Sequence, residues 1–206
     1  MKKRIIKIVI PIILIIAIII AVIIIRNNQK PEVHLLSEVY NQLNGITSYQ
    51  FQKEKDMNNK TIVVKDGNNV VIDNYTTGTH TTTIIKDNTT TYITHEKEEY
   101  YIYNNTNIDV NVVESWLADV VNREYTTGEE KIRGKKYYYE EYQGTTMFTD
   151  TNVLKTRFYF DNDNKLVYIK TIFSQMEEET LKIEISTDID KSLFDIPEEY
   201  MEISID

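Results

Sequence analysis

The stretch Ser48–Asp56 reads SYQFQKEKD, and it decides the fold class because apolar and polar residues alternate along it. Tyr49, Phe51 and Met57 fall on one side of an extended chain, and the glutamines and acidic residues between them fall on the other. A period of two residues is typical of a β-strand that turns one face toward a core. Residues 48–57 therefore predict the first strand of a sheet.

Further strands are predicted on both sides of short turns rich in Asn, Asp and Gly. Thr76–Thr94 is dominated by threonine, a β-branched residue that suits strands with one exposed face. The alternative for Thr76–Thr94 is a low-complexity linker, although its apolar residues recur at strand spacing. The other segments with strand character are 61–65, 70–75, 99–104, 131–142, 156–160, 166–173 and the alternating residues Leu181, Ile183 and Ile185.

Two segments have the helical period instead, one from Pro31 to about Asn44 and one from about Asn111 to Glu124. Asn111 and Glu114 have the spacing of a capping box at the start of the second helix. The apolar stripes of the two helices are Leu35, Leu36, Val39, Tyr40 and Leu43, and Val112, Val113, Trp116, Leu117, Val120 and Val121. Together these elements predict an α+β fold with both helices on the same face of one curved antiparallel sheet.

The segment Ile8–Ile25 contains no charged residue and is long enough, at about 1.5 Å per residue, to cross most of a bilayer as a helix. More basic residues precede it than follow it, which favours a cytoplasmic amino terminus and a single-pass protein of the cell membrane. A cleaved signal peptide is the alternative, but no small-residue cleavage site follows the segment. We therefore predict a cytoplasmic basic segment (1–7), a transmembrane anchor (8–25), a linker (26–30) and an extracytoplasmic α+β domain (31–206).

Composition excludes several classes of function. All 32 acidic residues follow the apolar segment, so the domain is more negative than the net charge of −9 of the whole chain. Such a surface is a poor partner for nucleic acid. The chain has no cysteine, which excludes disulfides, thiol catalysis and Cys-based metal sites. An exported domain without cysteine fits a bacterial cell envelope.

No motif in the sequence indicates catalysis or metal binding. His34, His80 and His95 share no ligand spacing and lie in different segments. Asp161–Asn164 is similar to the start of a calcium loop but lacks its glycine and its distal glutamate, so a hairpin turn is predicted there. We expect a protein that is not an enzyme and that has no catalytic residue, metal or cofactor.

Three stretches carry a resemblance to a known family: Val33–Phe51, Thr156–Ile169 and Asp190–Tyr200. In element order and strand endings they resemble the LolA-like superfamily of lipoprotein carriers, including membrane-anchored Gram-positive relatives, over residues 33–203. The resemblance implies a curved antiparallel half-barrel sheet whose concave apolar face is covered by helices and binds acyl chains. Because the predicted anchor prevents free shuttling, it implies a tethered module rather than a soluble carrier.

The function expected from these observations is membrane-tethered binding of a hydrophobic ligand, either a lipid or a lipidated protein. The alternative is a cell-envelope interaction or structural module whose core is filled by its own side chains. A third possibility is a surface that stacks tyrosines on cell-wall sugars, which requires a row of exposed aromatic residues. The residues expected to line the ligand site are Phe51, Val113, Trp116, Leu117, Val120, Phe158, Phe160 and Ile183.

Overall fold

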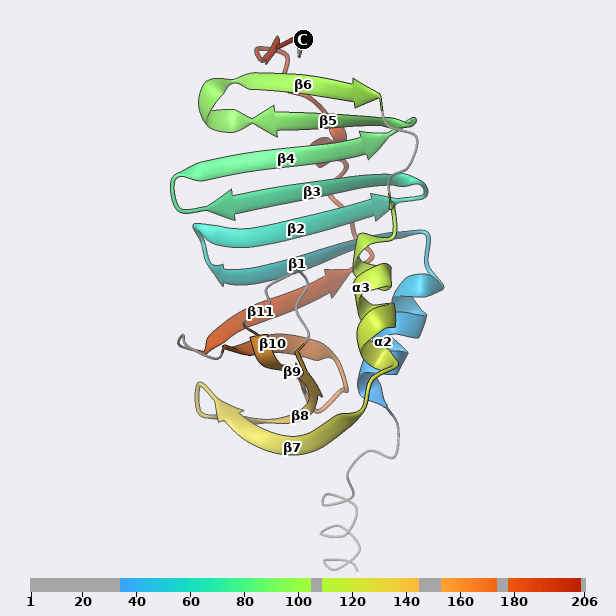
Figure 1. Ribbon diagram of the computed structural model, residues 1–206, viewed down its shortest axis with the longest axis vertical. Helices are drawn as coiled ribbons and strands as arrows, with labels where there is room; N and C mark the ends of the chain where they lie inside the picture. Colours follow the sequence, from blue (N-terminus) through green and yellow to red (C-terminus); the bar gives the residue numbers. More distant parts are fainter. Residues whose placement is uncertain (1–33, 105–108, 145–152, 174–177, 205–206) are drawn as a thin grey trace, which may run out of the picture. The chain divides into compact units, whose positions relative to one another are not determined.

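The central feature of the computed structural model is a sheet of twelve strands, with two α-helices packed beside it (Figure 1). The structure describes residues 34–104, 109–144, 153–173 and 178–204. In the sheet the strands follow the order β12-β6-β5-β4-β3-β2-β1-β11-β10-β9-β8-β7. Most neighbours in the sheet are therefore also neighbours along the chain.

The bounds of the elements agree with most of the strand and helix predictions. The helices are α2 (Leu35–Asn44) and α3 (Val112–Val121), with short 3₁₀ helices η1 (His95–Lys97) and η2 (Lys191–Phe194). The strands are β1 (Ser48–Asp56), β2 (Asn59–Asp66), β3 (Asn69–Thr76), β4 (Thr79–Lys86), β5 (Thr89–Thr94), β6 (Glu99–Asn104), β7 (Tyr125–Ile132), β8 (Lys135–Gln143), β9 (Val153–Phe160), β10 (Leu166–Phe173), β11 (Glu179–Ser186) and β12 (Met201–Glu202).

Tight turns build the meander from β1 to β5. Gly78 turns β3 into β4 with a φ of +83°, and Asp87 and Asn88 turn β4 into β5 with φ of 52° and 62°. Left-handed residues of this kind match the twist of two-residue hairpins. The threonine-rich stretch 76–94 therefore forms β4 and β5 and is not a linker.

The predicted fold class was wrong in its sheet. β12 pairs with β6 in parallel, Met201 opposite Glu99, so the sheet is mixed and it is not a closed or purely antiparallel half-barrel. The cause is the course of the chain after β11. This segment crosses one face of the sheet, and β12 then pairs with β6 at the far edge without a hairpin between them. Within the described residues no helix is both long and apolar enough to span a membrane, and the predicted anchor 8–25 lies outside them.

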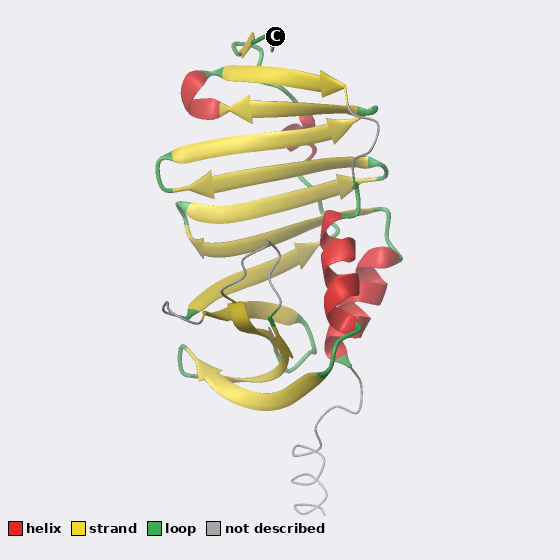
Figure 2. Cartoon of the chain, in the orientation of Figure 1, coloured by secondary structure: helices red, strands yellow, loops and turns green. Residues whose placement is uncertain are grey.

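The main core lies between the two helices and one face of the sheet (Figure 2). From the helices it takes the predicted stripes, including Leu36, Val39 and Leu117, all of which are buried. Its buried residues from the sheet are Tyr49, Phe51, Val63, Val70, Ile85, Tyr142, Phe158, Phe160, Leu166, Ile169 and Ile183. The burial of these large side chains stabilises the fold by roughly 1.5–3 kcal/mol each.

A second core covers the opposite face of the sheet, for which the sequence predicted no covering layer. Val64 and Val71 point away from the helices, because neighbouring residues in a strand face opposite sides. Leu193 and Phe194 of η2 pack against this cluster. The segment after β11 is thus a second covering layer for strands β2 to β5, which explains why those strands carry apolar residues on both faces.

A buried glutamate holds the start of α2 against the sheet. Glu140 of β8 is fully buried, and its carboxylate accepts hydrogen bonds from the backbone N–H of Leu35 at 2.7 Å and of Leu36 at 3.2 Å. Tyr142 donates to the same carboxylate at 2.9 Å. The first N–H groups of a helix have no partner within the helix, and a negative charge there is favoured by the helix dipole. Glu140 therefore caps α2 from a strand about a hundred residues away.

A second buried glutamate fastens α3. Glu114 accepts hydrogen bonds from Tyr49 and from Lys65, each at 2.6 Å. The predicted capping box does not form, because Glu114 turns toward the sheet and Asn111 makes no side-chain cap. Instead the Asn111 side chain accepts from Lys65 at 2.6 Å, so both residues connect the helix start to β2.

The cap made by Glu140 yields a stability prediction. Glu140→Ala removes the carboxylate that accepts from two helix N–H groups and from Tyr142, and it should lower the free energy of unfolding by about 3 kcal/mol or more. Glu140→Gln keeps one acceptor oxygen and should cost about 1–2 kcal/mol. Urea denaturation of the full chain measures both. The control is Glu129→Ala, which removes an exposed ion pair with Lys136 and should cost less than about 1 kcal/mol. If Glu129→Ala and Glu140→Ala lowered the free energy of unfolding equally, Glu140 would not be the cap of α2.

A network of charges lies on the face of β7 to β10 that points away from the helices. Glu130 accepts from Tyr159 at 2.6 Å, from Arg157 at 2.8 Å and from Lys170 at 2.9 Å. Glu141 accepts from Arg157 and Lys155. Burial by itself raises the pKa of both carboxyls, but these hydrogen bonds and cations outweigh it and hold each pKa below its ordinary value.

The sign of this shift predicts acid sensitivity. Below the ordinary carboxyl pKa of 4.5, Glu130 and Glu141 become protonated in the unfolded chain but remain ionised in the folded chain. The stability that these two carboxylates contribute is therefore lost as the pH falls through their lowered folded pKa. Urea unfolding from neutral pH to about pH 3 should show this loss. The double variant Glu130→Gln, Glu141→Gln should decline less steeply than the wild type, whereas Glu184→Gln, at an exposed site, should not alter the slope. Parallel curves for all three proteins would refute the role of the network.

Candidate functional site

The eight residues predicted to line a ligand site belong to the main core. Seven of them are at most 3% exposed, and Trp116 is partly buried. The ring of Trp116 lies 5.6 Å from that of Phe158 and 6.4 Å from that of Phe51. The helices and the sheet therefore pack on these residues directly. One of the eight, Ile183, also lines an open cleft.

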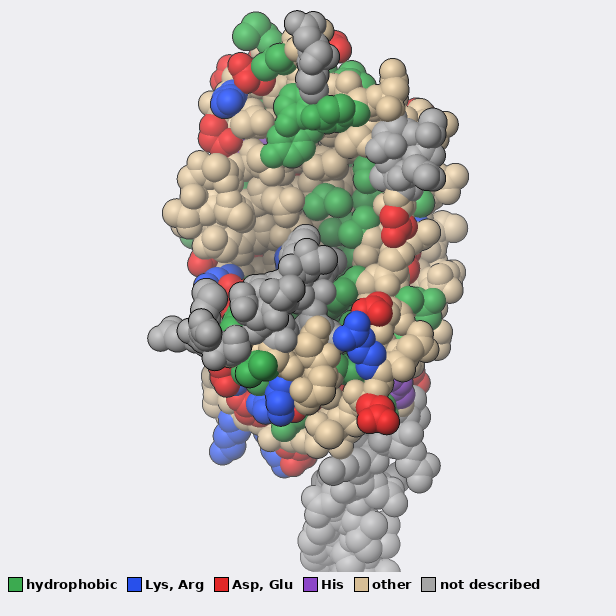
Figure 3. All heavy atoms as spheres, viewed as in Figure 1, with side chains coloured by type: hydrophobic (Ala, Val, Ile, Leu, Met, Phe, Trp, Pro, Cys, Tyr) green, Lys and Arg blue, Asp and Glu red, His purple; other side chains and the backbone are tan. Residues whose placement is uncertain are grey.

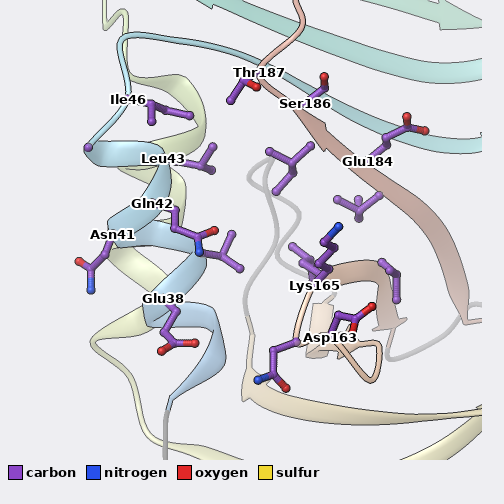
Figure 4. Close-up of a pocket in the computed structure, with 17 residues that line it drawn as sticks. Glu38, Asn41, Gln42, Leu43, Ile46, Asp163, Lys165, Glu184, Ser186 and Thr187 are labelled. Carbon is purple, nitrogen blue, oxygen red and sulfur yellow. The ribbon is translucent and has the colours of Figure 1, made fainter.

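This cleft lies between α2 and the strands β10 and β11, and its volume is about 1050 Å³ (Figure 4). Val39, Leu43 and Ile46 line it from the helix side. The opposite wall consists of apolar residues from the two strands: Leu166, Val167, Ile183 and Ile185. Clefts of this size with mainly apolar walls are typical of small-molecule sites.

Polar side chains surround the apolar walls. Figure 4 shows Glu38, Asn41 and Gln42 along the helix, and Ser186 and Thr187 at the end of β11. The turn between β9 and β10 adds Asp163, Asn164 and the cation Lys165. An apolar interior with a polar rim suits an amphipathic ligand, because its tail is desolvated while its head group stays in contact with polar groups and water.

The turn beside the cleft is held by local hydrogen bonds. The Asp161 carboxylate accepts from the backbone N–H of Asp163 at 2.9 Å and of Lys165 at 3.0 Å. Asn164 takes a φ of 60°, a left-handed conformation that asparagine tolerates. The prediction of a hairpin turn at Asp161–Asn164 is confirmed. The Asp161 carboxylate stabilises the turn by accepting hydrogen bonds from its backbone.

A second group of polar side chains meets on the opposite face of the sheet. One donor atom each from Asp73, His80 and His95 lies within 4.8 Å of the others, a grouping that could hold a metal ion. The spacing of these residues along the chain gives no sign of the cluster, so it was not predicted. The register of the strands brings these residues together. The tight turn at Gly78 places His80 opposite Tyr75 and Thr82 opposite Asp73. In the next strand pair, Thr94, the residue before His95, lies opposite Thr81.

Comparison with known proteins gives no family for the chain. No protein-family model matches it, and no curated protein matches it significantly. Among solved structures it is similar to an uncharacterized conserved protein from Thermus thermophilus, with a TM-score of 0.47 and 8% identity over 81% of this chain and 98% of that one. A likeness at this TM-score carries no argument, so the resemblance to LolA-like carriers rests on the sequence alone.

Proposed function

We propose that the domain binds an amphipathic ligand, the acyl chain of a lipid or of a lipidated protein, in the cleft between α2 and strands β10 and β11. The observation that carries this proposal is the cleft itself, with about 1050 Å³ of space and walls that are mainly apolar. The site differs from the one expected from the sequence, because the aromatic residues expected there pack as core. In this proposal the apolar segment 8–25 keeps the domain at an extracytoplasmic membrane surface.

The size of the hydrophobic effect supports useful affinity. Each CH₂ group removed from water contributes about 0.8 kcal/mol, so a chain of a dozen carbons contributes roughly 8–10 kcal/mol before ordering costs. Even after several kcal/mol of such costs, binding in the micromolar range remains. Lys165 is the cation among the residues that line the cleft, and it stands beside the carboxylates of Glu38, Asp163 and Glu184. A head group that carries both charges, or none, therefore suits this rim better than a purely anionic one.

A titration with dansyl-labelled undecanoic acid tests the proposal on the full chain. We expect a saturable rise in dansyl fluorescence with a micromolar dissociation constant. Ile46→Asp and Val167→Asp, one from each wall and both partly buried, should weaken binding by about tenfold or more because they place a charge against the chain.

The matched control is Leu154→Asp, which places the same charge on β9 at a side chain that is already 51% exposed. It should bind like the wild type. If the two cleft variants also bound like the wild type, the cleft would not be the site. If the wild type bound neither this probe nor the lipids of phosphatidylglycerol vesicles, the proposal would fail and the filled-core interaction module would be favoured.

A specific observation also favours stacking on sugars as a second candidate function. Tyr92 and Tyr101 stack with ring centroids 5.0 Å apart, and Tyr103, 44% exposed, meets Tyr101 edge to face at 5.2 Å. Figure 3 shows hydrophobic side chains gathered over β5 and β6, where these residues lie. A row of aromatic rings offers flat apolar faces with polar tips.

Calorimetric titration with oligomers of N-acetylglucosamine tests this candidate. Binding that is lost in Tyr103→Ala and retained in Tyr103→Phe, which preserves the ring, would support it. Absence of heat with the wild-type chain, or equal binding by Tyr103→Ala, would exclude this row as a sugar platform.

A further inference from the structure

We propose that Asp73, His80 and His95 bind a divalent first-row transition metal ion, with Zn²⁺ the ion that this donor set fits best. The site is independent of the cleft, because it lies on the opposite face of the sheet, where β3, β4 and η1 meet. Two imidazoles and one carboxylate are a common protein ligand set for Zn²⁺, with a water in the fourth position of tetrahedral coordination.

The three residues are already joined by short polar contacts. His80 Nε2 lies 2.8 Å from Asp73 Oδ1, and the hydroxyl of Thr82 donates to the same oxygen at 2.6 Å. Thr82 also lies 2.7 Å from His95 Nε2. These contacts link Asp73 Oδ1 and the two Nε2 atoms, through the Thr82 hydroxyl, in one continuous chain of donors and acceptors.

An unsatisfied oxygen marks the site. Asp73 is 1% exposed, and its second carboxylate oxygen, Oδ2, is buried without a well-formed hydrogen bond among the described residues. The hydroxyl of Tyr75 is a neighbour that interacts with this carboxylate. A buried polar atom without a partner costs free energy, and in native proteins such an atom is explained by an ordered water, an ion or a functional role. A cation beside Asp73 would satisfy this oxygen and balance the buried negative charge.

The protons between these residues occupy the place that a metal would take. Because Thr82 gives its single proton to Asp73, His95 Nε2 must carry a proton toward Thr82, and His80 Nε2 likewise donates to the carboxylate. A metal would replace both Nε2 protons, and each neutral imidazole would then carry its proton on Nδ1.

Binding requires one ring to turn. The rings of His80 and His95 are stacked, with centroids 3.6 Å apart and planes within 8° of parallel. Two parallel rings cannot both direct a lone pair at one ion. Tetrahedral bonds of about 2.0–2.2 Å also place the ligand atoms roughly 3.3–3.6 Å apart, so His80 Nε2 and Asp73 Oδ1, now 2.8 Å apart, must separate. The other face of the His80 ring stacks on Tyr75 with centroids 3.9 Å apart, so the ring must leave both neighbours to reach the ion. Its side chain is 27% exposed, which gives it one open side.

Tyr200, in the carboxy-terminal segment, orients the ligand His95. The hydroxyl of Tyr200 lies 3.0 Å from His95 Nδ1, and its oxygen can accept a hydrogen bond from the Nδ1–H that this imidazole would carry in the metal-bound form. Metal-binding histidines usually donate their other N–H to an oxygen in this way. Tyr200 is therefore a positioning residue, and metal binding would fasten the segment after β11 to the sheet.

The test is calorimetric titration of Zn²⁺ into the full chain, prepared without a polyhistidine tag and stripped with chelator. We expect saturation at one equivalent, a higher melting temperature with the ion, and a visible absorption spectrum when Co²⁺ replaces Zn²⁺. His80→Gln and Asp73→Asn should each weaken binding at least about tenfold, and Tyr200→Phe by about tenfold.

His34→Gln is the matched control, since it removes the histidine that does not belong to the cluster, and it should bind Zn²⁺ like the wild type. His80→Gln changes a partly exposed side chain and should remain folded, which circular dichroism verifies. The proposal is overturned if the wild type shows no saturable binding of Zn²⁺ or Co²⁺. It is also overturned if folded His80→Gln binds Zn²⁺ as tightly as His34→Gln does.

Discussion

The position of α2 on the sheet depends on one buried carboxylate. Glu140, on β8, accepts the first two N–H groups of α2 and the hydroxyl of Tyr142 in the absence of solvent. A buried charge is tolerated only when several donors surround it. This requirement fixes the position at which α2 starts. Because α2 is also one wall of the open cleft, the same contact sets the geometry of the proposed ligand site.

The sheet differs from a simple two-layer fold because both of its faces are used. One face carries the helices and the aromatic core, and the other carries the segment with η2 and Tyr200. This division separates two chemistries. The cleft is apolar with a polar rim, whereas the cluster around Asp73 consists of hydrogen-bonded groups that meet in the register of three strands. Ligand binding on one face and metal binding on the other can therefore be tested independently.

The sequence predicted the elements that depend on local pattern. The stripe of Leu36 and Leu43 on α2 and the alternation around Phe51 appear as expected, since period follows directly from which side chains are buried. What escaped prediction depends on contacts between distant residues. Glu114 has the spacing of a capping box in the sequence, but in the structure its carboxylate accepts hydrogen bonds from Lys65 and Tyr49. Similarly, the parallel pairing of β12 and the meeting of His80 with His95 follow from sheet register, which no periodicity along the chain reveals.

The central claim is that Glu140 fixes α2 and hence one wall of the cleft. Amide hydrogen exchange tests this claim most directly. It is measured by nuclear magnetic resonance on the wild type and on Glu140→Gln. The N–H groups of Leu35 and Leu36 have no partner within the helix, so their protection depends on the carboxylate. Because Glu140→Gln keeps one acceptor oxygen and the two amides bond different oxygens, we predict that at least one of these amides exchanges markedly faster in the variant, while amides in β2 and β3 keep their wild-type rates. Unchanged protection of both Leu35 and Leu36 in the variant would contradict the claim.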